Sequence, residues 1–242
     1  MKGIYIRLLV IRTYHTKMVM KLDKVVPFGR SLDEYTKMFD LSSEDLQQNI
    51  LGVGDGPASF NAEGTVQGYK ITSIDPIYQF DGAEIKQRFD AVVDNIINQI
   101  IATPDNWVWQ YHKNPQDLKA SRIQALELFL QDYQQGKRED RYLAQELPNL
   151  DLADRTYDLA LCSHFLFLYS EQLERDFHLA AIQEMLRVSK EVRIFPLLTL
   201  MQETSPYLDF VIDKFSTMAY SASIVRVPYE LQPGANEMLV IK

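Results

Sequence analysis

A chain of 242 residues with 46% hydrophobic and 24% charged positions is long enough to bury one full core without disulfides or structural metals. Its single cysteine excludes an intramolecular disulfide and a cysteine-based metal cluster, and it favours a reducing, cytoplasmic setting. The formal net charge of −8 disfavours a nucleic-acid partner, because such binding needs clustered Lys and Arg to neutralise phosphates.

The N-terminal segment, residues 1–20, is interpreted as a leader that is disordered or that precedes the true translation start. Its apolar run from Ile4 to Ile11 is too short to span a bilayer and is interrupted by Arg7, so no membrane association is expected. We assign residues 21–242 to one domain with a helical insertion at about 81–136.

Two short helices are predicted before the first strand. Ser31 and Glu34 have the spacing of a capping box, which starts a helix through Phe39. A second short helix around Ser43 to Gln48 leads into an apolar run that begins at Asn49.

A glycine turn ends this first strand. In Gly52-Val53-Gly54-Asp55-Gly56, glycine permits positive φ and lets bare N–H groups approach a ligand. Pro57 suits the first position of a following helix. A second strand, 70–74, ends at Asp75 and Pro76, and the carboxylate there can accept both ribose hydroxyls of an adenosine. The pattern predicts a βαβ unit that binds a nucleoside-bearing cofactor, although a glycine turn in an unrelated α/β domain is the simpler alternative.

The glycine spacing separates two classes of cofactor. A dinucleotide fingerprint reads G-x-G-x-x-G or A, and Pro57 occupies its sixth position in this chain. The pattern here is instead G-x-G-x-G, which resembles that of the class I S-adenosylmethionine-dependent methyltransferases. The resemblance continues in order from Phe28 to Lys242, through a loop-and-strand block at 147–164, a helix at 181–188 and a strand at 191–195.

This resemblance implies S-adenosyl-L-methionine as the cofactor and a donor–acceptor meeting point after the fourth strand. Two departures stand out: Ile50 replaces an acid common in the family, for which Asp55 is a substitute, and no acid clearly marks the adenine site, where Gln145 and Glu146 are weak candidates. The implied cofactor-binding residues are Gly52, Val53, Gly54, Asp55, Gly56, Asp75, Pro76, Ser163 and His164.

The insertion contains a helix with apolar residues from Ile85 to Ile100 and a second helix that follows Pro115 and stops near Gly136. An aromatic loop joins them, and it either forms a lid over an acceptor or packs the helices onto the sheet. Packing is the favoured role of the two tryptophans. The loop residues are Trp107, Trp109, Tyr111 and His112.

The C-terminal part predicts one amphipathic helix over 207–215 and two strands, 222–229 and 237–241, that form a hairpin. The expected fold is therefore α/β: a Rossmann-like three-layer α/β/α sandwich with a mostly parallel seven-stranded sheet and an antiparallel C-terminal strand. Dinucleotide dehydrogenases more often continue with parallel units, so this ending also favours methyl transfer.

His164 is the candidate catalytic residue, because a histidine beyond the fourth strand could take a proton from a hydroxyl or an amine. Its alternative role is a cap or a pocket wall. Tyr169 and His178 are weaker candidates, and Cys162 is expected to be a buried strand residue. The four histidines lack metal-ligand spacing, so no metal is expected.

The sequence therefore predicts a methyltransferase that uses S-adenosyl-L-methionine and a small-molecule acceptor. No Asn-Pro-Pro-Tyr or Asp-Pro-Pro-Tyr motif follows the fourth strand, which disfavours methylation of nucleic-acid bases. Two alternatives remain open: a non-catalytic module that binds S-adenosylmethionine or S-adenosylhomocysteine, and an NAD-dependent oxidoreductase, which Pro57 and the terminal hairpin oppose. The sequence leaves the acceptor and the oligomeric state open.

Overall fold

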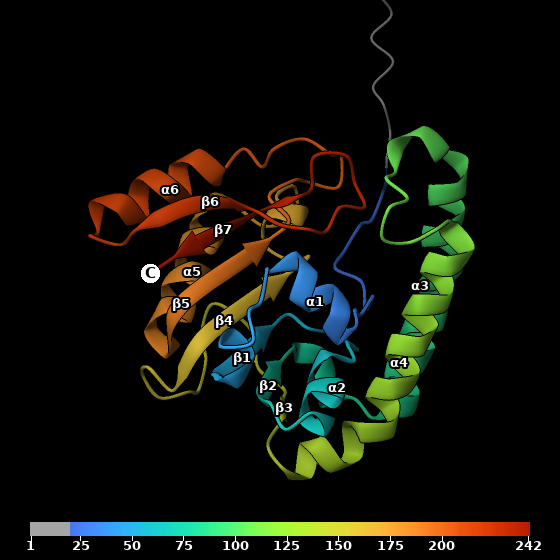
Figure 1. The fold of residues 1–242 in the computed structure, drawn as a ribbon, viewed down its shortest axis with the longest axis horizontal. Coiled ribbons are helices and arrows are strands. Elements are labelled where there is room, and N and C mark those ends of the chain that lie inside the picture. The colour runs from blue at the N-terminus through green and yellow to red at the C-terminus, as the bar shows by residue number, and fades with distance from the viewer. Residues whose placement is uncertain (1–19) are drawn as a thin grey trace, which may run out of the picture.

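The computed structural model describes residues 20–242, so the predicted leader at 1–20 lies outside the described residues except for Met20. A seven-stranded sheet in the order β3-β2-β1-β4-β5-β7-β6 forms the centre of the molecule (Figure 1). The strands are β1 (Asn49–Val53), β2 (Lys70–Ile74), β3 (Tyr142–Leu143), β4 (Tyr157–Ser163), β5 (Ser189–Phe195), β6 (Ala222–Arg226) and β7 (Glu237–Ile241).

The sheet has the predicted mixture of strand directions. Strands β1 to β5 pair in parallel, whereas β7 runs antiparallel to both β5 and β6. A direct connection can join antiparallel neighbours, while each parallel pair requires a crossover, which explains why helices separate the earlier strands. The helices are α1 (Leu32–Met38), α2 (Phe60–Val66), α3 (Gly82–Ala102), α4 (Pro115–Arg138), α5 (Arg175–Val188) and α6 (Leu208–Thr217), with short 3-10 helices η1 (Asp45–Gln47), η2 (Pro76–Gln79), η3 (Pro104–Asn106) and η4 (Phe167–Tyr169).

Helices cover both faces of the sheet. Since side chains alternate along a strand, Leu51 packs in the cluster under α5 and α6, and its neighbour Ile50 packs in the opposite cluster with α1 and α2. The insertion forms a third cluster around Phe89 and Phe129, and Figure 1 shows α3 and α4 as a long antiparallel pair beside the β2–β3 edge. The three-layer prediction is confirmed, and the inserted helix pair adds its own core.

One local prediction is corrected by the structure. Pro57 does not start the following helix, because α2 begins only at Phe60. The delay has a physical cause: the segment after Gly56 lies against Gly29, where a Cβ would be 2.2 Å from the carbonyl oxygen of Pro57. The helix that follows Pro115 does stop near Gly136 as predicted, because α4 ends at Arg138.

The remaining local differences are small. The predicted helix at 43–48 is only the 3-10 turn η1. The capping box of α1 is confirmed, with both reciprocal hydrogen bonds between Ser31 and Glu34 present.

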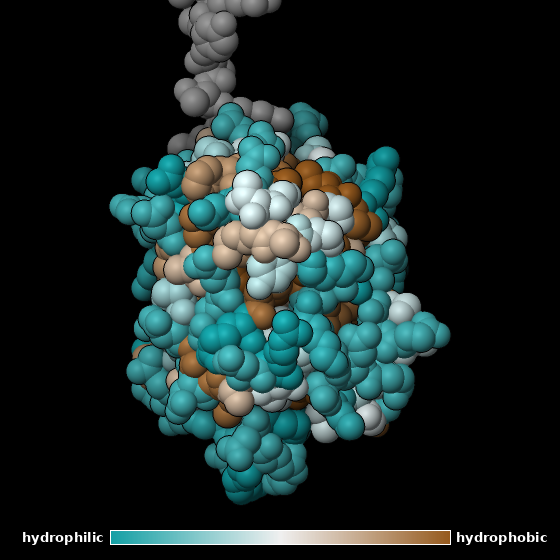
Figure 2. Space-filling model, turned by 90° about the vertical axis from the view of Figure 1, so that its left-hand side faces the viewer, coloured by the Kyte–Doolittle hydropathy of each residue, from teal (hydrophilic) through white to brown (hydrophobic). Residues whose placement is uncertain are grey.

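The surface that carries α6 is largely hydrophilic and is broken by small apolar patches (Figure 2). Among residues 20–242, no helix combines the length and hydrophobicity that a membrane-spanning segment requires.

Candidate functional site

A cleft of about 670 Å³ opens at the carboxyl ends of β1, β2 and β4, where ligands bind in open α/β sheets. We call it the glycine-turn cleft. Gly52 and Val53 lie in β1 and do not line it. The other predicted site residues do: Gly54, Asp55, Gly56, Asp75, Pro76, Ser163 and His164.

The glycine turn brings backbone to the surface of the cleft. Gly54 and Gly56 have φ values of 66° and 53°, which a side chain would strain. The Gly54 N–H donates to the carbonyl of Ile74 at 2.9 Å and joins the ends of β1 and β2. A Cβ on Gly56 would find no atom closer than 3.9 Å, so this position leaves open space for a ligand.

The Asp75 carboxylate stands at the end of β2. One oxygen accepts from the Gly56 N–H and the other from the Ile77 N–H, both at 2.8 Å. Burial raises the pKa of Asp75 to about 6, although these two hydrogen bonds act to lower it. Each carboxylate oxygen has further acceptor capacity, so Asp75 can still accept two ligand hydroxyls.

Asp55 is engaged inside the protein. Its two oxygens accept from Tyr35 Oη and Ser73 Oγ, each at 2.6 Å, and the side chain is only 5% exposed. The carboxylate folds over Gly52, where a Cβ would lie 1.9 Å from Asp55 Oδ2. Burial raises the pKa of Asp55 to about 7. These contacts give Asp55 a supporting role under the turn, and its contact with a ligand stays a prediction.

His164 occupies a tight turn directly after β4, with φ 51° and its N–H donating to the Phe195 carbonyl at 2.6 Å. Its Nδ1 lies 3.0 Å from Ser163 Oγ. Burial and the nearby charges of Arg30 and Arg122 hold the pKa of His164 well below its ordinary value. The imidazole is therefore neutral at physiological pH, and Nε2 can accept a proton when Nδ1–H donates to Ser163.

A second, smaller cavity of about 70 Å³ adjoins the cleft, and we call it the apolar cavity. The two share four wall residues: Val26, Phe28, Arg30 and His164. Most other walls are aliphatic or aromatic and come from distant parts of the chain. These walls include Trp107, Arg122, Tyr169, Tyr229 and Leu231.

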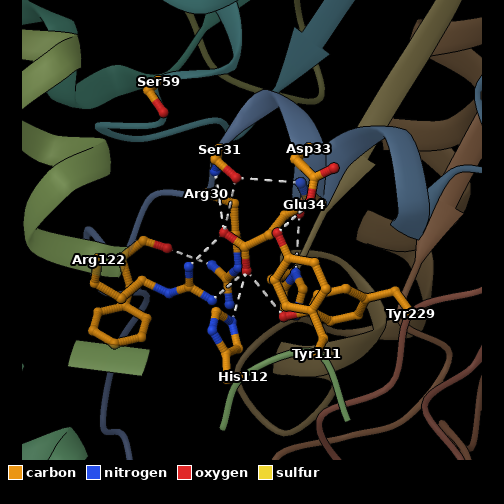
Figure 3. A network of polar contacts seen from close by, with 12 residues as sticks. Arg30, Ser31, Asp33, Glu34, Ser59, Tyr111, His112, Arg122 and Tyr229 are labelled. Atoms are coloured by element: carbon orange, nitrogen blue, oxygen red, sulfur yellow. Dashed lines mark hydrogen bonds and ion pairs between the residues drawn. The ribbon is translucent and has the colours of Figure 1, made fainter. Parts of the chain in front are cut away.

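A buried polar network closes one side of the apolar cavity (Figure 3). Glu34 accepts two hydrogen bonds from Arg122, at 2.6 and 2.7 Å, and one from Tyr229 Oη at 3.0 Å. His112 Nε2 lies 3.2 Å from the same carboxylate. Burial alone would raise the pKa of Glu34, but Arg122 holds it well below its ordinary value. The network joins α1, the α3–α4 loop, α4 and the β6–β7 connection.

Few features of the sequence indicate this network. Glu34 was predicted only as a capping residue, and Arg122 and Arg30 carried no motif. Helical spacing could have placed Arg122 on the buried face of α4, since Leu118, Ala125 and Leu126 are buried on that helix. A cation on such a face requires a partner from elsewhere in the chain.

The aromatic loop mainly packs. Trp107 is 8% exposed in the core cluster of α3 and α4, and Trp109 packs against that cluster, as expected for both tryptophans. Trp107 also lines the apolar cavity. Tyr111 lies against Tyr229 with ring centroids 5.0 Å apart.

The weaker candidates separate clearly. Tyr169 lines the apolar cavity and accepts from the Val26 N–H at 3.3 Å. His178 lines neither cavity, and its ring nitrogens lie 3.0 Å from the carbonyl oxygens of Glu174 and Leu166, which indicates a packing role. Cys162 is buried in β4, and burial raises its pKa to about 12, so its thiol is unreactive.

Neither a metal centre nor the weak adenine candidates contribute to the site. Within residues 20–242, no three His, Cys, Asp or Glu side chains are placed to share a metal ion. Gln145 and Glu146 do not line the glycine-turn cleft.

The strand order and the single antiparallel strand, β7, are set by the pairings of the described sheet. An uncharacterized protein of Methanocaldococcus jannaschii is 34% identical over 224 residues, which cover 92% of this chain and 98% of that protein. The chain therefore belongs to the same family as that archaeal protein. No family model matches the sequence.

The solved structures to which this chain is similar are much more distant in sequence. Magnesium protoporphyrin IX methyltransferase of Synechocystis PCC 6803 with bound S-adenosylmethionine has a TM-score of 0.42 at 10% identity, covering 87% of this chain and 76% of that one. A methyltransferase of Aquifex aeolicus has a TM-score of 0.41 at 14% identity and covers 87% of both chains. The N-methyltransferase NodS of Bradyrhizobium japonicum has a TM-score of 0.42 at 13% identity, covering 86% of this chain and 92% of that one.

Proposed function

We propose that the protein is an S-adenosylmethionine-dependent methyltransferase that acts on a small molecule. One observation carries this proposal: the glycine-turn cleft, with Asp75 at the end of β2, meets the apolar cavity at His164. A ligand in the cleft and a ligand in the cavity would therefore be in contact beside a neutral imidazole.

The residues of the cleft fit the cofactor. Its volume of about 670 Å³ lies within the usual range for small-molecule sites, which is roughly 300–1,000 Å³. Asp75 would hold the ribose hydroxyls, and the open backbone at Gly56 would allow close approach. Ile77 and Phe80 supply apolar walls beside Asp75 for the adenine ring.

When bound, S-adenosylmethionine supplies an electrophilic methyl group. The chain would then mainly position the acceptor and exclude water, which can supply much of the rate enhancement in a direct displacement. His164 Nε2 would accept the proton of a hydroxyl, thiol or amine acceptor. Ser163 would hold the required tautomer by accepting from Nδ1–H.

Calorimetric titration of the protein with S-adenosylmethionine, S-adenosylhomocysteine and NAD tests the proposal. We expect both adenosyl ligands to bind and NAD not to bind. Asp75→Ala should weaken both affinities about 10- to 100-fold, since hydrogen bonds to a charged group are worth about 1.5–3 kcal/mol. Asp90→Ala on the exposed face of α3 is the matched control and should leave them unchanged.

Two other outcomes would redirect the assignment. Binding of NAD alone would indicate an oxidoreductase. Tight binding of the adenosyl ligands, without release of S-adenosylhomocysteine when S-adenosylmethionine and a small-molecule cell extract are supplied, would indicate a non-catalytic binding module.

A further inference from the structure

Arg30 is half-buried and differs in its ion pairing from Arg122, the fully buried arginine of the site. Its Nη1 donates to the Phe28 carbonyl, and its Nε, like that of Arg122, is buried and makes no hydrogen bond. Within residues 20–242, no carboxylate forms an ion pair with Arg30, although Arg122 nearby is paired with Glu34 through two hydrogen bonds. The walls of the apolar cavity therefore contain a cation that makes no direct ion pair within the described residues and that shares the charge of Glu34 with Arg122.

The charges around Arg30 give an excess of one positive charge. Arg30 and Arg122 are cationic, and Glu34 is the anion of this group. Burial and Arg122 lower the pKa of Arg30 to about 10, which keeps its guanidinium protonated at neutral pH. A half-buried charge without a direct ion pair has lost part of its hydration, so this position favours binding of an anion.

The surroundings of Arg30 restrict the shape of that anion. The Phe28 ring centroid lies 5.8 Å from the guanidinium carbon, and Trp107 and Leu231 line the same cavity. A volume of about 70 Å³ leaves room for a compact group and excludes a polymer segment. A planar guanidinium matches a carboxylate with two parallel hydrogen bonds, and one excess charge matches a monoanion better than a phosphate dianion.

We propose that the apolar cavity holds the methyl acceptor and that this acceptor is a small apolar carboxylic acid, with its carboxylate on Arg30 and its methylated group toward His164. The inference rests on the proposed function. It assigns Arg30 as a specificity-determining residue of the acceptor site.

A matched ligand series tests the charge preference. Isovalerate, isovaleramide and isopentylamine offer the same branched chain with an anionic, a neutral and a cationic head. We would titrate each by calorimetry into the protein saturated with S-adenosylhomocysteine. We expect isovalerate to bind at least tenfold more tightly than the amide, and the amine not to bind.

Variants of Arg30 connect the preference to this residue. Arg30→Met should reduce the preference for isovalerate over isovaleramide to less than twofold, whereas Arg30→Lys, which keeps the charge, should retain a part of it. Arg138→Met, an exposed arginine at the end of α4, should behave like the wild type. Thermal melts of each variant establish that it is folded, and Arg30→Lys keeps the test valid if Arg30→Met does not fold.

Three results would overturn the inference. The first is equal binding of isovalerate and isovaleramide to the wild type. The second is a preference for isovalerate that survives in Arg30→Met. The third is that Arg30→Met weakens the binding of S-adenosylhomocysteine but not that of 5′-methylthioadenosine, which lacks the amino-acid part. Arg30 would then hold the carboxylate of the cofactor.

The proposed function can fail separately. If neither adenosyl ligand binds the wild type, the methyltransferase assignment fails. The isovalerate series without cofactor would then still report whether Arg30 forms an anion site.

Discussion

The glycine-turn cleft and the apolar cavity lie side by side, yet they are built in different ways. The distinctive features of the cleft are backbone groups and one carboxylate at the ends of neighbouring strands, at Gly54, Gly56 and Asp75. The apolar cavity is built from side chains of segments that range from Met20 to Ala235. A backbone-built site depends on local sequence, whereas a side-chain-built site depends on the whole fold.

The largest effect is expected where the two cavities meet. His164→Gln should lower kcat about 10²- to 10⁴-fold, because the amide cannot accept a proton as the imidazole does. Its affinity for S-adenosylhomocysteine, measured by calorimetry, should stay within about twofold of the wild type. Unchanged kcat would remove His164 from the mechanism and leave it as a wall shared by the two cavities.

The next effect concerns stability on the side of the apolar cavity. Glu34→Gln removes the counter-charge of Arg122 and should lower the free energy of unfolding by about 3–5 kcal/mol, measured by urea denaturation. The matched control is Asp33→Asn. The exposed ion pair between Asp33 and Lys37 contributes about 1 kcal/mol or less to the free energy of unfolding. Equal effects of the two substitutions would mean that the network does not hold α1 to α4.

Asp55 gives a pH-dependent test of the support beneath the cleft. The folded protein keeps this proton up to about pH 7, whereas the unfolded chain loses it near pH 4. Raising the pH through this window therefore favours unfolding. Asp55→Asn should make the free energy of unfolding less dependent on pH. At pH 8 the free energy of unfolding of the variant should exceed that of the wild type by about 2–4 kcal/mol, since one pKa unit corresponds to about 1.4 kcal/mol.

Denaturant melts at pH 4 and pH 8 measure this effect. The difference between the variant and the wild type isolates Asp55 from Asp75, whose raised pKa acts in the same direction in both proteins. Parallel profiles for the two proteins would show that Asp55 is ionised in the folded state throughout the window.

The smallest effect concerns ligand binding in the cleft. The pKa of Asp75 is about 6, and its carboxylate form is the one that accepts two ribose hydroxyls. Affinity for S-adenosylhomocysteine should therefore fall about tenfold between pH 7 and pH 5, because a tenfold excess of the protonated form exists one unit below the pKa. Asp75→Asn should bind S-adenosylhomocysteine weakly, with an affinity that does not depend on pH. If the variant and the wild type show the same pH dependence of affinity, another group causes the effect.

The sequence predicted the sheet, its antiparallel strand, and the glycine turn that lies beside Asp75, because each of these depends on a short segment with its own periodicity or turn-forming residues. It did not predict the partners of Glu34, since a capping box explains that residue completely when only neighbours are considered. Arg122 is 88 positions away in the chain and Tyr229 is 195 away. No local pattern encodes contacts over such separations.

The same physical distinction explains the error at Pro57. A proline after a glycine turn favours a helix start, but Gly29 packs against the Pro57 carbonyl and the helix begins only at Phe60. Tertiary contact overrode a local preference. Asp55 is similar, because its hydrogen bonds to Tyr35 and Ser73 come from α1 and β2.

The segment from Val26 to Arg30 forms a wall of both cavities, and it is held to the glycine turn by the close packing of Gly29 and by the hydrogen bond from the Ser59 N–H to the Arg30 carbonyl at 3.0 Å. A ligand that binds in either cavity and orders this segment also orders a wall of the other cavity. We therefore expect heterotropic cooperativity, in which each ligand raises the affinity of the other by the same factor.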